Sequence, residues 1–186
     1  LDYQGPKKKN LLLVNVFYPP QDIGGATHVV RDNVDIICKR YSDEFNIDII
    51  CTNNGGLKPL HYEVYSEEKT KVRVWKITTP LHKNGDMQEY SPEVLEKFRE
   101  IVSHIQPDII HFHCIQRLTA SIIDVAIEKK IPYFITVHDG WWISDNQFIL
   151  DGDGNKSLYN YNKEDMQLTK RQNILKTRLK NAKRIF

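Results

Sequence analysis

The sequence lacks the features that would assign a membrane or metal function directly. No apolar run approaches the roughly 20 residues that a helix needs to cross a bilayer. The 186-residue chain has only three cysteines, and Cys38, Cys51 and Cys114 are scattered without the paired spacing of a zinc site. We therefore expect reduced thiols in a cytoplasmic protein.

Net charge and phosphate-binding motifs are equally sparse. A formal net charge of +2 is too small to indicate nucleic acid, so we expect no nucleic-acid partner. Neither the Gly-x-Gly-x-x-Gly fingerprint of dinucleotide-binding domains nor a P-loop is present. The content of 40% apolar and 27% charged residues is that of an ordinary globular protein.

What the sequence does contain is an alternation of strand and helix patterns. A buried strand over 11–17 leads through a glycine-containing loop into a helical pattern that runs to about Tyr41, and a second strand follows over 46–51. This β-loop-α-β order opens a doubly wound sheet. We read residues 1–9 as a leader or linker. Residues 10–186 then form one Rossmann-like α/β domain, with an open, mainly parallel sheet and helices on both faces.

The rest of the chain continues the same pattern with small hairpin additions. Ser91 and Pro92 predict a helix start, because serine caps the first turn and proline needs no hydrogen-bond acceptor there. The other predicted elements are a hairpin or two short strands over 62–76, strands over 108–113 and 131–138, a helix over about 119–130, a small hairpin over 147–158, a tail helix over 163–183 and the beginning of a strand at 184–186.

The strand over 131–138 ends in the residues that most strongly indicate a function. Its apolar run stops at His138 and Asp139, and Gly140, Trp141 and Trp142 follow. In an open parallel sheet the carboxyl end of a strand faces the ligand crevice, which makes His138 the candidate catalytic residue. The His138–Asp139 pair fits a general base, a hydrogen-bond donor to a substrate hydroxyl, or a structural pair. The two tryptophans either stack on a sugar or pack the following loop.

The loop after the first strand carries two adjacent glycines. Gly24 and Gly25 let the backbone approach a ligand closely, and the N-terminus of the following helix favours an anion such as phosphate. A tight turn that requires glycine is the alternative.

Three histidines raise the question of a metal. We expect the imidazoles of His111 and His113 to face opposite sides of their strand, which would make joint coordination awkward. With Cys114 and His138 they include no cysteine pair that would complete a zinc site. We therefore expect no metal, and we take His113, nearest the strand end, as a residue that lines the site.

Together these motifs resemble the amino-terminal domain of GT-B glycosyltransferases of family 4. The resemblance is carried by Phe17-Tyr18-Pro19-Pro20 with Gly24-Gly25-Ala26, by the segment from Pro107 to His113, and by Thr136-Val137-His138-Asp139 with Trp141-Trp142. It implies the acceptor-side half of a retaining transferase of polysaccharide biosynthesis. Such an enzyme moves a sugar from a nucleotide-sugar to a glycan or lipid-linked acceptor without a metal or other cofactor.

The resemblance also implies roles for individual residues. Gly24 and Gly25 match the glycine loop that faces the donor pyrophosphate and the acceptor, and His138 matches the histidine beside the reacting sugar. His113 and Asp139 match positions that line the same cleft, and Trp141 is a further candidate for substrate binding. The nucleotide-sugar-binding domain, with its Glu-x7-Glu motif, is missing. We therefore expect this polypeptide alone to be inactive.

Two other functions remain open. The chain fits a stand-alone, non-catalytic α/β module that holds a glycan or a protein partner, or a flavodoxin-like enzyme with phosphate at the glycine loop. The tail helix has seven lysines and arginines between Leu168 and Arg184 and no acid. That composition suits either peripheral contact with anionic lipid at the inner face of the membrane or a solvated surface.

Overall fold

A computed structural model of the chain describes residues 7–53, 60–79, 85–143 and 170–186. Within these ranges a seven-stranded sheet has the order β3-β4-β2-β1-β5-β6-β7. Neighbouring strands are parallel except β3 and β4, which pair antiparallel. In chain order the elements are β1 (Lys9–Val14), α1 (Gly25–Arg40), β2 (Phe45–Thr52), β3 (His61–Ser66), β4 (Arg73–Thr78), the 3₁₀ helix η1 (Gly85–Met87), α2 (Pro92–Ile105), β5 (Ile109–Phe112), α3 (Ile122–Glu128), β6 (Tyr133–Ile135), the 3₁₀ helix η2 (Gly140–Trp142), α4 (Lys170–Lys180) and β7 (Arg184–Ile185).

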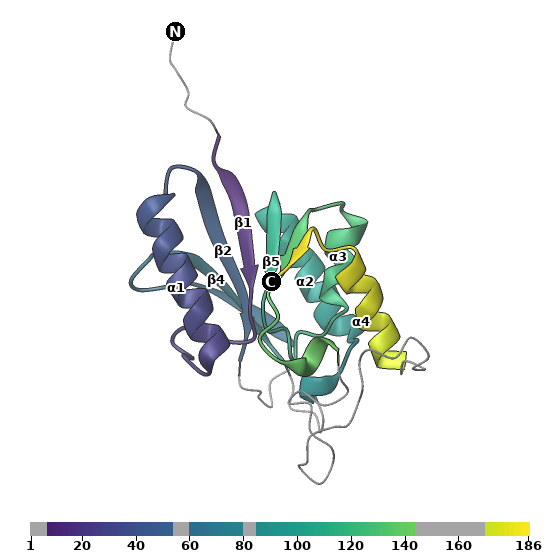
Figure 1. Cartoon of the computed structure of the whole chain (residues 1–186). Coiled ribbons are helices and arrows are strands. Elements are labelled where there is room, and N and C mark those ends of the chain that lie inside the picture. Colours follow the sequence, from purple (N-terminus) through teal and green to yellow (C-terminus); the bar gives the residue numbers. More distant parts are fainter. Residues whose placement is uncertain (1–6, 54–59, 80–84, 144–169) are drawn as a thin grey trace.

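Helices cover both faces of the sheet, as predicted. Figure 1 shows α1 on one side of the strands and α2, α3 and α4 on the other. Side chains alternate accordingly along β1, because Leu12 and Val14 belong to the cluster on the α2 side while Leu13 packs with Val30 and Val34 of α1. A central strand buried on both faces reads as a continuous apolar run. The predicted fold class, an open and mainly parallel Rossmann-like sheet, is confirmed.

The predicted start of α2 is confirmed in detail. The Ser91 hydroxyl accepts a hydrogen bond from the backbone N–H of Val94, and Pro92 occupies the first turn. The helix ends at Gln106, which adopts a left-handed conformation with φ 51°. The buried side chains of the helix form one apolar stripe of Val94, Leu95, Phe98, Ile101, Val102 and Ile105.

Strands β1, β5 and β6 end earlier than the sequence pattern predicts, whereas β2 extends past its predicted end to Thr52. β1 includes Lys9, which was expected in the leader, and stops at Val14. Beyond the formal ends, single bonds continue the pairing: Asn15 N–H donates to the Ile50 carbonyl (3.0 Å) and Thr136 N–H to the Phe112 carbonyl (2.9 Å). Regular pairing between the parallel strands therefore ends before the loops begin, and the residues at the strand ends line the edge of the sheet.

The peripheral predictions have mixed outcomes. The hairpin expected over 62–76 is present as β3 and β4. The strand expected at the end of the chain is present as β7, which pairs with β6. The tail helix is described as α4, whereas 163–169 and the hairpin expected over 147–158 lie outside the described residues.

Candidate functional site

A hollow of about 590 Å³ opens at the carboxyl ends of the central strands. Gly24, Gly25, His138 and Asp139, which the sequence analysis selected separately, all line it. The remaining lining residues are Val16, Phe17, Ile23, Ala26, Thr27, Val29, Asp86, Cys114, Gln116 and Arg117. Its volume lies within the range of sites that bind small molecules.

The two glycines play different conformational parts. Gly24 precedes α1 with φ 82° and ψ 157°, a combination that is essentially restricted to glycine. Gly25 is the first residue of α1, and nothing lies within 4 Å of a Cβ built on either glycine. The turn therefore requires glycine at position 24. At position 25 the backbone does not require glycine, and the glycine only leaves open space beside the hollow.

This difference predicts opposite effects of alanine at neighbouring positions. Gly24→Ala is expected to lower the free energy of unfolding by about 1–3 kcal/mol, because a side chain is strained at this φ and ψ. Gly25→Ala is expected to leave the free energy unchanged or to raise it by up to about 1 kcal/mol, because it only restricts the unfolded chain. Urea denaturation of the two variants checks this. Equal destabilisation would contradict the assignment of the strain to Gly24.

Asn15 connects the glycine loop to the loop after β5. Its side-chain amide donates to the Phe17 carbonyl (2.7 Å) and to Thr27 Oγ1 (3.2 Å), and its carbonyl oxygen accepts from Cys114 N–H (3.2 Å). The side chain is fully buried, so these bonds are not exposed to competition from water. Asn15 was not among the predicted site residues, although it directly follows β1, where the same strand-end rule selects it.

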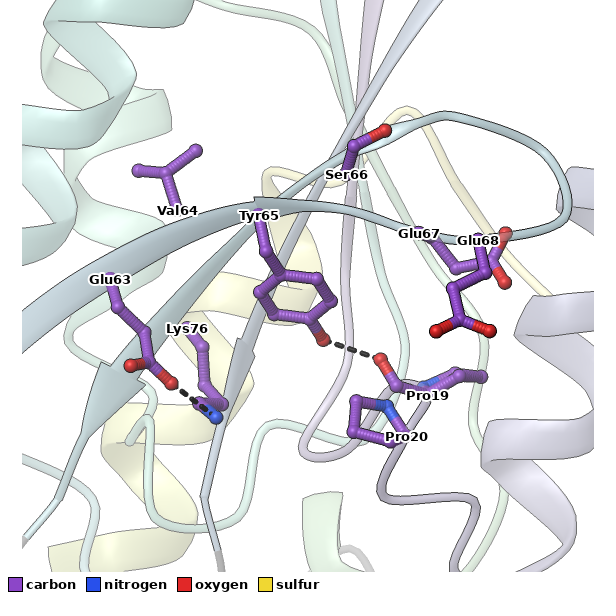
Figure 2. Close-up of a pocket in the computed structure, with 9 residues that line it drawn as sticks. All are labelled: Pro19, Pro20, Glu63, Val64, Tyr65, Ser66, Glu67, Glu68 and Lys76. Carbon is purple, nitrogen blue, oxygen red and sulfur yellow. Dashed lines mark hydrogen bonds and ion pairs between the residues drawn. The ribbon is translucent and has the colours of Figure 1, made fainter.

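The glycine loop is also held from the hairpin side. A second hollow of about 470 Å³ is lined by Pro19, Pro20 and residues of β3 and β4 (Figure 2). There the Tyr65 hydroxyl donates to the Pro19 carbonyl, and Lys76 forms an ion pair with Glu63. The lining of this hollow includes none of the predicted site residues. The Tyr65 contact thus ties the first part of the loop to the sheet edge.

The three histidines form one cluster, contrary to the expectation for His111 and His113. That expectation was wrong, because residues two apart on a strand share a face. Their ring centroids lie 4.1 Å apart, and His113 Nδ1 lies 3.1 Å from His138 Nε2. His111 Nε2 is 2.8 Å from Thr136 Oγ1. His113 itself is fully buried behind His138 and does not line the hollow.

Burial keeps these imidazoles neutral. It lowers the pKa of His111 to about 4 and that of His113 to about 2, with neighbouring histidines adding to the effect. Burial also lowers the pKa of His138, and the Asp139 carboxylate partly opposes that shift. At neutral pH the cluster therefore presents uncharged hydrogen-bonding groups.

Asp139 is held by donors on both carboxylate oxygens. Oδ1 accepts from Trp141 N–H (2.9 Å), which caps η2, and Oδ2 accepts from Gln116 Nε2 (3.2 Å). The residue still lines the hollow. Its geometry thus supports a fixed negative charge beside His138, and its contact with a substrate stays a prediction.

Trp141 lies away from the hollow. It is 1% exposed, and its indole N–H donates to the Asp86 carbonyl (2.6 Å). The Arg171 guanidinium lies 4.6 Å from the ring centroid, and Trp142 packs edge-on at 5.2 Å. In this arrangement a sugar cannot reach the faces of the Trp141 ring. Of the two alternatives given for the tryptophans, packing and not sugar stacking describes Trp141.

Gln116 and Arg117 line the hollow and were not among the predicted site residues. Gln116 is 6% exposed, and its Nε2 bonds Asp139, while its buried Oε1 has no hydrogen-bond partner within the described ranges. Arg117 has φ 66°, pairs with Asp86 (2.6 Å) and lies over the Phe17 ring. Strained backbone of this kind clusters at functional sites. The sequence signal that could have identified Gln116 and Arg117 as site residues is their position just after β5.

No cluster of three or more metal-ligating side chains occurs in the ranges that the structure describes. The prediction of a metal-free reaction stays a prediction.

The basic tail is partly turned inward. Arg171 donates to the carbonyls of Met87 (3.1 Å) and Trp141 (2.7 Å), and Arg178 donates to Asp124 (2.7 Å). The basic surface is thus smaller than the sequence suggests, and lipid contact stays a prediction. Among the helices described, none combines the length and apolarity required to cross a membrane.

Comparisons with known proteins address the family and the fold of the chain. The family profile of Glycosyltransferase Family 4 matches residues 23–186. Sucrose-phosphate synthase from Thermosynechococcus elongatus has a similar fold, with a TM-score of 0.55 and 15% identity over 96% of this chain and 42% of that one. An α,α-trehalose 6-phosphate synthase from Burkholderia multivorans matches with a TM-score of 0.41 and 11% identity over 71% of this chain and 33% of that one. No curated protein matches the sequence.

The chain thus spans less than half the length of these two solved structures. The profile match covers most of the 186 residues and includes the glycine loop and the strand end at His138. This chain belongs to Glycosyltransferase Family 4.

Proposed function

We propose that this chain is the acceptor-side domain of a retaining glycosyltransferase, which transfers a sugar from a nucleotide-sugar to a glycan or lipid-linked acceptor. One observation carries the proposal: in a family 4 chain, the glycine loop and the strand-end His138 meet in one hollow. A second domain, outside this chain, would bind most of the nucleotide. In that arrangement the hollow is the acceptor's side of the cleft.

The groups in the hollow suit the recognition of a sugar beside a phosphate. The backbone of the glycine loop permits close approach, and the N-terminus of the 16-residue helix α1 favours negative charge. Asp139 offers carboxylate oxygens to sugar hydroxyls, while Arg117 supplies a cation. Neutral His138 supplies a hydrogen-bonding group that does not repel a cationic transition state.

The reaction that we propose is a substitution on one face of the donor sugar. The bond from the anomeric carbon to the leaving phosphate oxygen breaks while the acceptor oxygen bonds to the same carbon. The leaving phosphate takes the proton of the acceptor hydroxyl. No metal is required in this scheme, and His138 orients the sugar and stabilises developing charge in place of acting as a nucleophile.

A transfer assay with the complete protein tests this function. We expect release of nucleotide from a nucleotide-sugar that depends on a glycan or lipid-linked acceptor, with the product's anomeric configuration, read by NMR, the same as the donor's. Excess chelator should leave the rate unchanged. Inversion of the anomeric centre would contradict the retaining mechanism. Glycan binding without any transfer would support a non-catalytic module instead.

A further inference from the structure

We propose that His113 is a positioning residue that fixes the tautomer of His138. From behind His138, it determines that the His138 imidazole presents an N–H donor, and not a basic nitrogen, to the hollow. The tautomer is a property of the two side chains themselves. Only its use on a sugar substrate rests on the proposed function.

The contact between the two rings admits two arrangements of the shared proton. His113 Nδ1 and His138 Nε2 lie 3.1 Å apart, with ring centroids 5.4 Å apart and planes tilted by 30°. A hydrogen bond at this distance needs one proton between the two nitrogens. Because burial keeps both imidazoles neutral, each ring carries a single proton. One of the two rings therefore donates its proton in the contact. The other ring accepts there and carries its own proton on the nitrogen that faces away from the contact.

The far nitrogen of His113 decides between the two arrangements. His113 Nε2 is buried and bonds none of the residues that the structure describes. If His138 donated in the contact, His113 would carry its proton on Nε2, where a buried N–H would have no acceptor. If His113 donates through Nδ1, Nε2 holds only an unused lone pair. Orphaned buried N–H groups are rarer in proteins than under-used acceptors. The geometry thus favours donation from His113 Nδ1.

A neighbouring contact keeps His113 Nε2 without a donor. His111 stacks on His113 with centroids 4.1 Å apart, yet its Nε2 is engaged with Thr136 Oγ1 at 2.8 Å. Among the described residues nothing else bonds the His113 ring. The stack therefore holds the ring in place and leaves its proton for the contact with His138.

The consequence appears on the open side of His138. With Nε2 accepting from His113, the His138 proton resides on Nδ1. Among the described residues no hydrogen-bond partner of Nδ1 is found, and His138 is half-buried and lines the hollow. A neutral Nδ1–H stabilises an oxygen of the substrate, but it cannot accept the acceptor's proton. His138 is thereby assigned the role of a donor, and general-base catalysis through Nδ1 is excluded.

Long-range ¹H–¹⁵N NMR of histidine-labelled protein tests the tautomer directly, because protonated and bare ring nitrogens have widely separated shifts. The chain has seven histidines, so the signals of His113 and His138 are assigned from the His113→Leu and His138→Ala variants. We expect protonated Nδ1 and bare Nε2 in both rings at neutral pH. A protonated Nε2 on His138 in the unmodified protein would overturn the proposal.

Two substitutions at position 113 separate positioning from mere packing. His113→Leu introduces an apolar side chain of similar size and removes the donor, so His138 should shift toward the Nε2–H form. His113→Asn places an amide N–H near the former Nδ1 and should restore the Nδ1–H form. An unchanged His138 tautomer in folded His113→Leu would refute the role of His113.

An activity measurement keeps this inference apart from the proposed function. In the complete protein His113→Leu should lower kcat by roughly tenfold with little change in KM, because the donor to the substrate is lost. His113→Asn should recover most of that loss. If the unmodified protein transfers no sugar, the proposed function fails while the tautomer result stands. Full activity in His113→Leu would refute the use of the donor in catalysis.

Discussion

Replacement of His138 by alanine is expected to lower kcat of the complete protein by on the order of 100-fold, because a positioned hydrogen-bond donor to an oxygen of the substrate is lost. Acceptor binding should change much less. The imidazole is half-buried at the wall of the hollow and contacts His113, so its nitrogen is held in one place before the substrate arrives. Such preorganisation stabilises the transition state more than the ground state.

Steady-state kinetics over a range of acceptor concentrations measure this effect. His104→Ala is the matched control, since it also removes an imidazole but lies on the exposed surface of α2, where it stacks on Trp75. The control should retain the kinetic constants of the unmodified protein. Unchanged kcat in His138→Ala, or an effect confined to KM, would remove His138 from the catalytic step.

The sheet and its core follow from short-range patterns in the sequence. Apolar runs of strand length, such as 11–14, are buried on both faces in a parallel sheet, and the 3.6-residue period over 94–105 fixes one face of α2. The place of His138 also follows from a local rule, because the carboxyl end of a parallel strand opens onto a crevice. These inferences need no knowledge of which segments meet in space.

The contacts between loops do not follow from such patterns. The roles of Gln116 and Arg117 depend on a backbone that turns through positive φ at Arg117, and nothing in that stretch marks the turn with glycine. Asn15 reaches Cys114 across 99 positions, a contact that only the register of β1 with β5 creates. The placement of His113 was open to sequence reasoning, since the spacing from His111 fixes their common face. The expectation that the two imidazoles face opposite sides of the strand was therefore wrong.

Trp141 shows the same limit, and its replacement should have the largest effect on stability. Trp141→Ala is expected to lower the free energy of unfolding by about 3–5 kcal/mol, since removal of a fully buried aromatic side chain leaves a cavity. The free energy of unfolding of Trp141→Phe should lie between those of Trp141→Ala and the unmodified protein, because phenylalanine keeps an aromatic ring but does not donate to the Asp86 carbonyl. Urea denaturation followed by circular dichroism gives these values.

The control and the contrary outcome distinguish packing from substrate stacking. Tyr90→Ala removes an aromatic side chain that is 50% exposed and should change the free energy of unfolding by less than about 0.5 kcal/mol. If Trp141→Ala instead kept the stability of the unmodified protein and weakened glycan binding, the ring would have to leave its position beneath Arg171 to meet a sugar. If the free energy of unfolding instead rises from Trp141→Ala through Trp141→Phe to the unmodified protein, the role of Trp141 is to pack η2 against α4.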